Sequence, residues 1–372
     1  MTSPSPTRAI EELAPTRPFV APEELARRAG HASLLRLGAN ESAFGPPPRA
    51  LEAMRAELPR VSWYGDPEST ELRAALAARH GCGFENIVIG SGIDELLGLA
   101  VRAFLAPGDV SVATLGTYPT YSYHVAGFGA RLETAPYAAD GRVQLDTLAG
   151  LAHATGARVA YLANPDNPSG SFAARDAVAR FRDALPAQCL LLLDEAYGDF
   201  VAPAELLGET LDPRVLRMRT FSKAFGLAGA RIAYAVGSAQ AIAAFGKIRL
   251  QYGVNRTAQI GALAALREDA FVANVVAEVA RGRAEYAALA AEAGLRSLPS
   301  RTNFTCIEIG SRGAAERMVE ELLRLAVFVR KPGAAPLDGF VRVTVGTERE
   351  RESFAAAFRE AIRALPAQSA LR

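Results

Sequence analysis

Short apolar runs alternate with segments of helical periodicity through most of this chain. Several of the runs lack polar alternation, which is typical of strands buried on both faces of a parallel sheet. The pattern therefore predicts an α/β fold with a mainly parallel central sheet. The expected strands are NIVIG (86–90), DVSVAT (109–114), RLETAP (131–136), RVAYLANP (158–165), CLLLLDEAY (189–197), RVLRMRTFSK (214–223) and RIAYAVG (231–237).

The C-terminal third has a different order of elements. TNFTCIEIG (302–310), a helical segment near 312–326, VFVRKP (327–332), FVRVTVG (340–346) and a last helix from about 348 read as β-α-β-β-α. At 372 residues the chain is long enough for a large and a smaller domain. We expect a large domain over 41–265, and a smaller α+β domain built from 1–40 together with 266–372.

The charge balance limits the classes of partner. With 41 basic and 40 acidic residues the net charge is +1, which gives no reason to expect a nucleic-acid or membrane partner. The three cysteines have no disulfide or metal-ligand spacing, and the four histidines are scattered, so no metal site is expected. The chain start has no signal-like apolar core, so we expect a cytoplasmic protein.

Polar side chains follow three consecutive predicted strands. Asn167 comes after RVAYLANP, Asp194 ends the leucine run, and Lys223 follows the next strand. In open α/β sheets, ligand sites gather at the carboxyl ends of the strands. We therefore expect these three residues to lie in one site.

Asp194 and Lys223 suggest complementary chemistry. A buried carboxylate needs a partner, which is either the next loop or a cationic ligand group such as a protonated ring nitrogen. Lys223 could form a surface salt bridge, but Phe221, Ala224 and Phe225 make exposure less plausible. A desolvated amine has a lowered pKa and becomes nucleophilic at neutral pH.

Two nearby segments could hold a phosphate. Arg231, Thr220 and Ser222 offer a guanidinium and hydroxyl groups, and the backbone of Ile93, Asp94 and Glu95 opens a helix after the GSG turn. An amine for a Schiff base, a carboxylate for a ring nitrogen and a phosphate cradle together indicate pyridoxal 5'-phosphate.

At this point the motifs resemble a known family, the fold-type I, class I/II pyridoxal phosphate-dependent aminotransferases, and most closely the histidinol-phosphate aminotransferase branch. The resemblance runs through nearly the whole chain from about residue 34. It rests on motifs in the family's order, namely LGANESAFGPP, WYGDPESTELRAALA, ANPDNPSG, DEAY, TFSKAFGLAGAR and VRVTVGT.

The resemblance implies a role for each matching residue. Lys223 would form the Schiff base and Asp194 would bind the ring nitrogen. Tyr197 and Asn167 would bind the ring's phenolic oxygen, and Tyr121 would stack on the ring. The phosphate would lie against the start of the 93–95 helix, Thr220, Ser222, Arg231 and Tyr64 of a neighbouring subunit, which implies a homodimer with shared active sites.

The substrate residues follow from the same resemblance. Arg342 would bind the substrate's carboxylate or phosphate, assisted by Arg330, while Asn40 and Glu41 would line the entrance. From the residues alone, Arg342, Arg330 and Glu41 could instead face solvent, and Tyr64 and Tyr121 could be core or interface aromatics. The N-terminal arm carries Phe19 where this branch usually has a phosphate-binding tyrosine.

The sequence leaves three functions open. The first is an aminotransferase using histidinol phosphate, or an aromatic amino acid, with 2-oxoglutarate. The second is a decarboxylase of the threonine-phosphate type, which shares the fold and most cofactor contacts. The third is a cofactor-binding regulatory domain fused to a DNA-binding module, which the absence of a basic arm disfavours.

Overall fold

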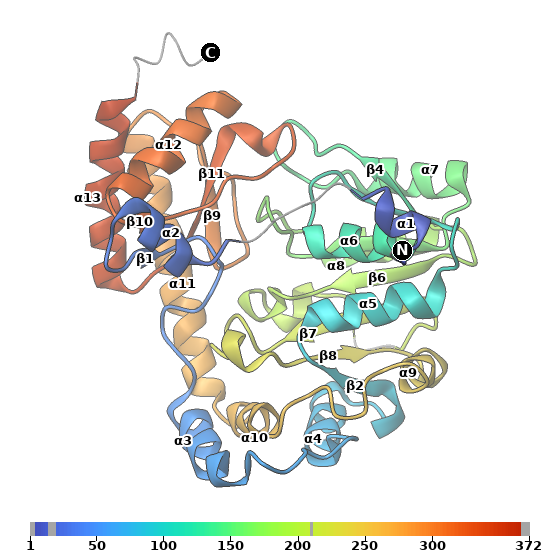
Figure 1. Ribbon diagram of the computed structural model, residues 1–372. Coiled ribbons are helices and arrows are strands. Elements are labelled where there is room, and N and C mark those ends of the chain that lie inside the picture. Colours follow the sequence, from blue (N-terminus) through green and yellow to red (C-terminus); the bar gives the residue numbers. More distant parts are fainter. Residues whose placement is uncertain (1–3, 14–19, 209–210, 366–372) are drawn as a thin grey trace.

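The computed structural model describes residues 4–13, 20–208 and 211–365. Within these residues the main sheet has seven strands in the order β2-β8-β7-β6-β5-β3-β4 (Figure 1). The strands are β2 (Ile87–Gly90), β3 (Val110–Thr114), β4 (Arg131–Ala135), β5 (Val159–Ala163), β6 (Leu190–Asp194), β7 (Val215–Thr220) and β8 (Ala233–Val236).

Most neighbouring strands of this sheet are parallel, as predicted. The pairs β4-β3, β3-β5, β5-β6 and β6-β7 are parallel, whereas β8 runs antiparallel to both β7 and β2. Only a short 3₁₀ turn lies between β7 and β8, which is too little for a helical crossover, so the chain reverses there. The expected α/β fold is confirmed.

Helices cover both faces of the sheet (Figure 1). The leucine run of β6 shows why: Leu190 and Leu192 pack with α5, α6 and α9, while Leu191 and Leu193 pack with α7 and α8. Helices α4 and α10 cover the β2-β8 end. The bounds are α3 (Pro48–Glu57), α4 (Thr70–His80), α5 (Ile93–Phe104), α6 (Pro119–Gly127), α7 (Leu145–Thr155), α8 (Arg175–Ala184), α9 (Ala239–Gly246) and α10 (Arg256–Ala265).

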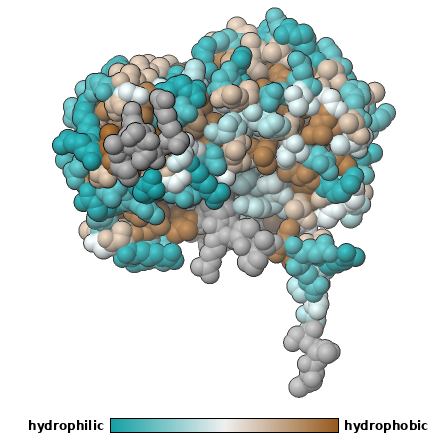
Figure 2. All heavy atoms as spheres, turned by 90° about the horizontal axis from the view of Figure 1, so that it is seen from above, coloured by the Kyte–Doolittle hydropathy of each residue, from teal (hydrophilic) through white to brown (hydrophobic). Residues whose placement is uncertain are grey.

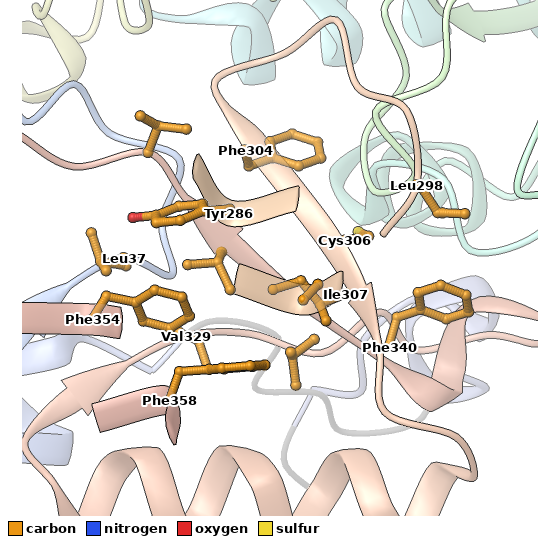
Figure 3. Packing of buried hydrophobic residues seen from close by; sticks show 14 of the residues in the cluster. Leu37, Tyr286, Leu298, Phe304, Cys306, Ile307, Val329, Phe340, Phe354 and Phe358 are labelled. Atoms are coloured by element: carbon orange, nitrogen blue, oxygen red, sulfur yellow. The ribbon is translucent and has the colours of Figure 1, made fainter. Parts of the chain in front are cut away.

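The C-terminal elements build a separate hydrophobic cluster, whose Phe354, Phe358, Tyr286 and Phe304 are seen in Figure 3. The predicted β-α-β-β-α order is observed, and strands β9 and β11 pair antiparallel. Strand β10 instead pairs in parallel with β1 of the N-terminal segment. The elements are α11 (Asp269–Glu292), β9 (Phe304–Glu308), α12 (Arg312–Arg324), β10 (Val327–Phe328), β11 (Phe340–Thr344) and α13 (Glu348–Ala364), with α1 (Arg8–Glu11), α2 (Pro22–Ala29) and β1 (Leu35–Arg36).

The expected domain limits at residues 41 and 266 stay a prediction.

On the face shown in Figure 2, hydrophobic residues lie in patches among hydrophilic ones. Within the described ranges, no helix is both long and apolar enough to cross a bilayer.

Candidate active site

Parallel pairing brings the predicted strand ends together. Ala163, the last residue of β5, pairs with Asp194 at the end of β6, and Asp194 pairs in turn with Met218 of β7. The loops that follow these strands carry Asn167 and Lys223, so both residues start from the same edge of the sheet.

Lys223 lies in the connection from β7 to β8 and is partly buried. Its Nζ donates a hydrogen bond to the backbone oxygen of Asn40 at 3.0 Å and lies 5.6 Å from the centre of the Tyr197 ring. Burial lowers the pKa of the amine from 10.5 to about 8, and the positive charge of Arg342 acts in the same direction. A neutral, nucleophilic form is therefore accessible close to neutral pH.

Asp194 is 4% exposed and accepts two hydrogen bonds. The Tyr161 hydroxyl donates to Oδ2 at 2.8 Å, and the Ala196 backbone nitrogen donates to Oδ1 at 3.0 Å. Burial raises the pKa of Asp194 from 3.8 to about 6, opposed by these hydrogen bonds and by the charge of Lys223. The carboxylate is still mostly charged at neutral pH and suits a cationic partner.

Asn167 and Tyr197 are linked to the C-terminal elements. Arg342 of β11 donates from Nη1 to Asn167 Oδ1 at 2.5 Å and from Nη2 to the Gly38 oxygen at 3.1 Å. Asn40 Nδ2 donates to the Tyr197 hydroxyl at 2.8 Å. Among the described residues Arg342 has no carboxylate partner, although its charge lies close enough to Lys223 to lower the pKa of the amine.

Helix α5 begins at Ile93, directly after Gly92, whose positive φ of 84° favours glycine. A Cβ at Gly92 would lie 2.2 Å from Nη2 of Arg231, so only glycine lets the guanidinium approach this turn. The Glu95 carboxylate accepts a hydrogen bond from the Ser91 backbone nitrogen at 2.5 Å, which fixes the turn. The start of α5 therefore presents backbone N–H groups beside a guanidinium.

The other expected phosphate ligands lie at the same place. Arg231 Nη2 is 3.2 Å from Asp94 Oδ2, so its guanidinium faces the first turn of α5. Thr220 and Ser222 are buried, with their hydroxyl oxygens 2.9 Å apart. A helix start, a guanidinium and hydroxyl donors are the groups that bind a phosphate in proteins.

Tyr121 does not face this group, contrary to the expectation. It is fully buried on the sheet side of α6, stacks on Tyr161 with ring centres 4.3 Å apart, and shares a 2.5 Å hydrogen bond with Ser111. Tyr118, which precedes α6, is the tyrosine directed to the site, because its hydroxyl donates to Asp94 Oδ1 at 2.7 Å. The two tyrosines are three residues apart, so the point where α6 begins decides which one enters the core.

The remaining expected residues are more dispersed. Arg330 shares a backbone bridge with Arg342 and donates to the Val20 oxygen at 3.4 Å. The Glu41 carboxylate is bound to Arg36. Tyr64 is 76% exposed, and its ring lies against Tyr252, with ring centres 4.5 Å apart. Phe19 lies outside the described residues.

The comparisons with known proteins agree with this geometry. Residues 32–358 match the family model described as aminotransferase class I and II.

The chain belongs to this family.

Histidinol-phosphate aminotransferase 2 of Nitrosospira multiformis is 34% identical to this aminotransferase over 95% of the chain and 90% of its own length. Histidinol-phosphate aminotransferase of Roseiflexus castenholzii is 37% identical, over 92% and 94%. The crystal structure of histidinol-phosphate aminotransferase from Sinorhizobium meliloti in complex with pyridoxal 5'-phosphate is 42% identical, with a TM-score of 0.92 over 97% of this chain and 98% of that one.

This protein is therefore a fold-type I, pyridoxal phosphate-dependent aminotransferase, and the expected fold, cofactor and enzyme class are confirmed. The decarboxylase and regulatory-domain alternatives receive no support from these relatives. The side chains fit the cofactor: Asp194 supplies a buried carboxylate, Lys223 an amine of lowered pKa, and the Gly92 turn a cradle that a Cβ would fill.

Two residues near Asp194 and Asp94 were missed in the sequence. Tyr161 appeared only as an apolar-run residue, although its position on the strand next to the one ending in Asp194 was a usable signal. For the ring contact, the motif resemblance indicates Tyr121 and not Tyr118. Asn303 was also missed; its Nδ2 donates to the backbone oxygens of Asn40 and Glu41 at 3.1 and 3.2 Å.

Proposed function

We propose that this aminotransferase moves an amino group between histidinol phosphate and 2-oxoglutarate. The single observation that carries the proposal is the similarity to the three proteins reported above, which are named histidinol-phosphate aminotransferases and are 34 to 42% identical over nearly the full chain. The Arg342 guanidinium, without a carboxylate partner among the described residues, is consistent with an anionic substrate. An aromatic amino acid is the second candidate, because Phe19 lacks the hydroxyl that this branch usually directs at the substrate phosphate.

The cofactor would be held at three points. Asp194 would pair with the ring nitrogen, while Tyr197 and the amide nitrogen of Asn167 would bind the phenolic oxygen. The start of α5 with Thr220, Ser222 and Arg231 would take the phosphate. We assign the ring contact to Tyr118 in place of Tyr121. The cofactor supplies an electron-withdrawing ring that stabilises negative charge at the substrate's α-carbon.

Lys223 is the general acid–base group in this proposal. With its pKa lowered to about 8, the amine is neutral often enough to accept a proton and charged often enough to return it. The Asn40 carbonyl oxygen accepts a hydrogen bond from Nζ at 3.0 Å and so fixes the position of the amine in the β7–β8 connection.

Arg342 would bind the substrate's anionic group, assisted by Arg330. Its guanidinium is fixed by Asn167 and the Gly38 carbonyl, so little rotamer freedom is lost when substrate binds. Asn40 would line the substrate side of Lys223, and Glu41 would lie at the entrance, where its carboxylate meets Arg36.

We further propose a homodimer in which Tyr64 reaches the phosphate site of the neighbouring subunit. Tyr64 belongs to an exposed apolar patch between the end of α3 and the start of α10, which we call the Trp63 patch. Its rings lie close together, with Tyr64 and Tyr252 4.5 Å apart. The patch comprises Leu58, Val61, Trp63, Tyr64, Leu250 and Tyr252. Exposed aromatic surface of this kind marks an interface. A cytoplasmic location remains a proposal from the sparse cysteines.

A panel of amino donors, each with 2-oxoglutarate, tests the substrate. We expect the highest kcat/KM with histidinol phosphate, followed by the aromatic amino acids. A higher value for an aromatic amino acid would replace histidinol phosphate by the second candidate. Release of carbon dioxide without glutamate formation would overturn the proposed reaction.

A further inference from the structure

Tyr161 directs its hydroxyl at the Asp194 carboxylate from the neighbouring strand. In the parallel β5-β6 pair, Tyr161 is opposite Leu192 and Ala163 is opposite Asp194, so Tyr161 and Asp194 point to the same face of the sheet. The hydroxyl donates to Oδ2 at 2.8 Å, and both side chains are almost entirely buried. A buried phenol hydroxyl needs a hydrogen-bond acceptor, and the Asp194 carboxylate provides it.

The hydrogen bonds to Asp194 divide between its two oxygens. Tyr161 donates to Oδ2 and the Ala196 backbone nitrogen donates to Oδ1 at 3.0 Å, so the plane of the carboxylate is fixed from both sides. The Ala196 donor belongs to the backbone after β6 and cannot be removed by substitution. The Tyr161 donor is a side chain whose only polar atom is the one in contact.

The Tyr161 ring is itself held in place. Tyr121 stacks on it almost in parallel, at 13° with ring centres 4.3 Å apart. The Tyr121 hydroxyl and Ser111 Oγ are 2.5 Å apart, and Ser111 donates to the Val159 backbone oxygen at 3.0 Å. Tyr121, Tyr161 and Ser111 are each no more than 1% exposed. This chain of contacts anchors the phenol to strands β3 and β5.

We propose that Tyr161 is a positioning residue, which keeps the Asp194 carboxylate charged and correctly oriented for the ring nitrogen of the cofactor. Tyr121 acts one step further back, through its stack on Tyr161. The inference rests on the proposed function only through the cofactor, because the identity of the amino donor plays no part in it.

The electrostatic surroundings explain why a donor matters at this position. Burial raises the pKa of Asp194 and the Asp94 charge from α5 raises it further, whereas Tyr161, Ala196 and the Lys223 charge lower it. Tyr118 and Tyr197 lie close enough to feel this carboxylate in turn, because burial and, to a smaller extent, the Asp194 charge raise the pKa of both phenols. Removal of the phenol would therefore let a proton compete with the ring nitrogen at neutral pH.

Tyr161→Phe removes only the hydroxyl and leaves the stack on Tyr121. Tyr137→Phe is the matched control, because Tyr137 is also buried and donates to a different buried carboxylate, Asp166, at 2.9 Å. The apoenzymes are titrated with pyridoxal 5'-phosphate between pH 5 and 9, and binding is followed by absorbance. Loss of a hydrogen bond to a charged group corresponds to roughly tenfold or more in affinity.

We expect Tyr161→Phe to bind the cofactor about tenfold more weakly at pH 7.5, and the acid limb of its binding profile to move up by about one pH unit. Tyr137→Phe should follow the wild-type profile. Tyr121→Leu, which removes the stacked ring but keeps the Tyr161 hydroxyl, should shift the profile in the same direction by less.

A wild-type profile for Tyr161→Phe overturns the proposal, and so does an equal shift in Tyr137→Phe, because that would reflect general loosening of the core. Neither result touches the proposed function, since wild-type turnover is measured separately. Failure of the proposed function would appear instead as wild-type enzyme that does not transaminate histidinol phosphate.

Discussion

The amine of Lys223 donates a hydrogen bond to the backbone carbonyl of Asn40, a residue 183 positions earlier in the chain. Asn40 has a left-handed backbone (φ 54°) and its side chain also donates to Tyr197. The segment before α3 therefore forms one wall of the site. Asparagine tolerates this backbone conformation better than most residues, which accounts for its use at this bend.

Lys223→Ala should abolish transamination, because in the proposed mechanism the amine both anchors the cofactor and moves the proton. We expect kcat to fall by at least about 10²–10⁴-fold, together with the absorbance of the lysine-bound cofactor. Lys247→Ala, at an exposed lysine after α9, should leave both unchanged. Retention of turnover in Lys223→Ala would rule out the assigned role.

The lowered pKa of Lys223 should also change how the stability of the apoenzyme varies with pH. The unfolded chain keeps the amine protonated up to about pH 10.5, whereas the folded chain releases the proton near pH 8. Between these values the unfolded state binds more protons, so this group makes stability rise with pH, and below pH 8 its full penalty is present.

Lys223→Met removes that penalty. We expect the variant apoenzyme to be more stable than wild type at pH 7 by about 1–3 kcal/mol, and the difference to shrink between pH 8 and 10.5. Urea unfolding of both proteins across this range measures it, with Lys247→Met as the control. Parallel stability curves for wild type and Lys223→Met would show that the folded-state pKa of the amine is not lowered.

Asp194→Asn should separate cofactor binding from catalysis. The amide keeps a similar shape and the phosphate contacts at α5 are untouched, so the protein should still bind cofactor, although at least as weakly as Tyr161→Phe, because the carboxylate that pairs with the ring nitrogen is gone. Without a carboxylate the ring nitrogen is not held protonated, and kcat should fall by about 10²–10³-fold. In single-turnover experiments, a rate constant for amino-group transfer close to the wild-type value would refute the electrostatic role of Asp194.

Arg342→Gln should weaken substrate binding. Loss of a charge-assisted hydrogen bond corresponds to about 1.5–3 kcal/mol, so kcat/KM should fall roughly ten- to hundredfold, chiefly through KM. Arg296→Gln is the control, because Arg296 is surface-exposed and pairs with Glu308. An unchanged KM for every anionic donor would place the substrate elsewhere.

Mixing two impaired variants at limiting cofactor, where each alone has little activity, tests the shared site. Tyr64→Ala should weaken cofactor binding in the homodimer, and Lys223→Ala lacks the amine. If Tyr64 serves the neighbouring subunit, subunit exchange creates one intact site per hybrid, and activity should reappear on mixing. A mixture that stays inactive although exchange is shown by mass spectrometry contradicts the shared site, and a monomer by light scattering contradicts the dimer.

Much of the site was predictable because its signals are local. The leucine run before Asp194 and the apolar neighbours of Lys223 can be interpreted from the side-chain period of a strand and the cost of burying a charge. The roles of Gly92 and Arg231 could also be predicted locally, because both residues lie within a few positions of a strand end. The parallel sheet then brought these ends to one edge, as such sheets do.

Contacts between distant segments could not be predicted in the same way. Pro119 is typical of a helix start, but no local pattern indicates that α6 turns the Tyr121 ring toward Tyr161 and leaves Tyr118 for the site. The Arg342–Asn167 contact joins residues 175 positions apart. Strand β10 pairs with β1 rather than with β9 or β11, because the N-terminal segment lies against its edge.

The sequence alone thus determined the fold class, the cofactor and the residues at its strand ends, since these depend on side-chain period and on the chemistry of single residues. Only the tertiary structure decided which tyrosine enters the core, which phenol supports Asp194 and which carbonyl holds Lys223. Those choices depend on helix starts, strand register and the packing of segments far apart in the chain, which local patterns do not encode.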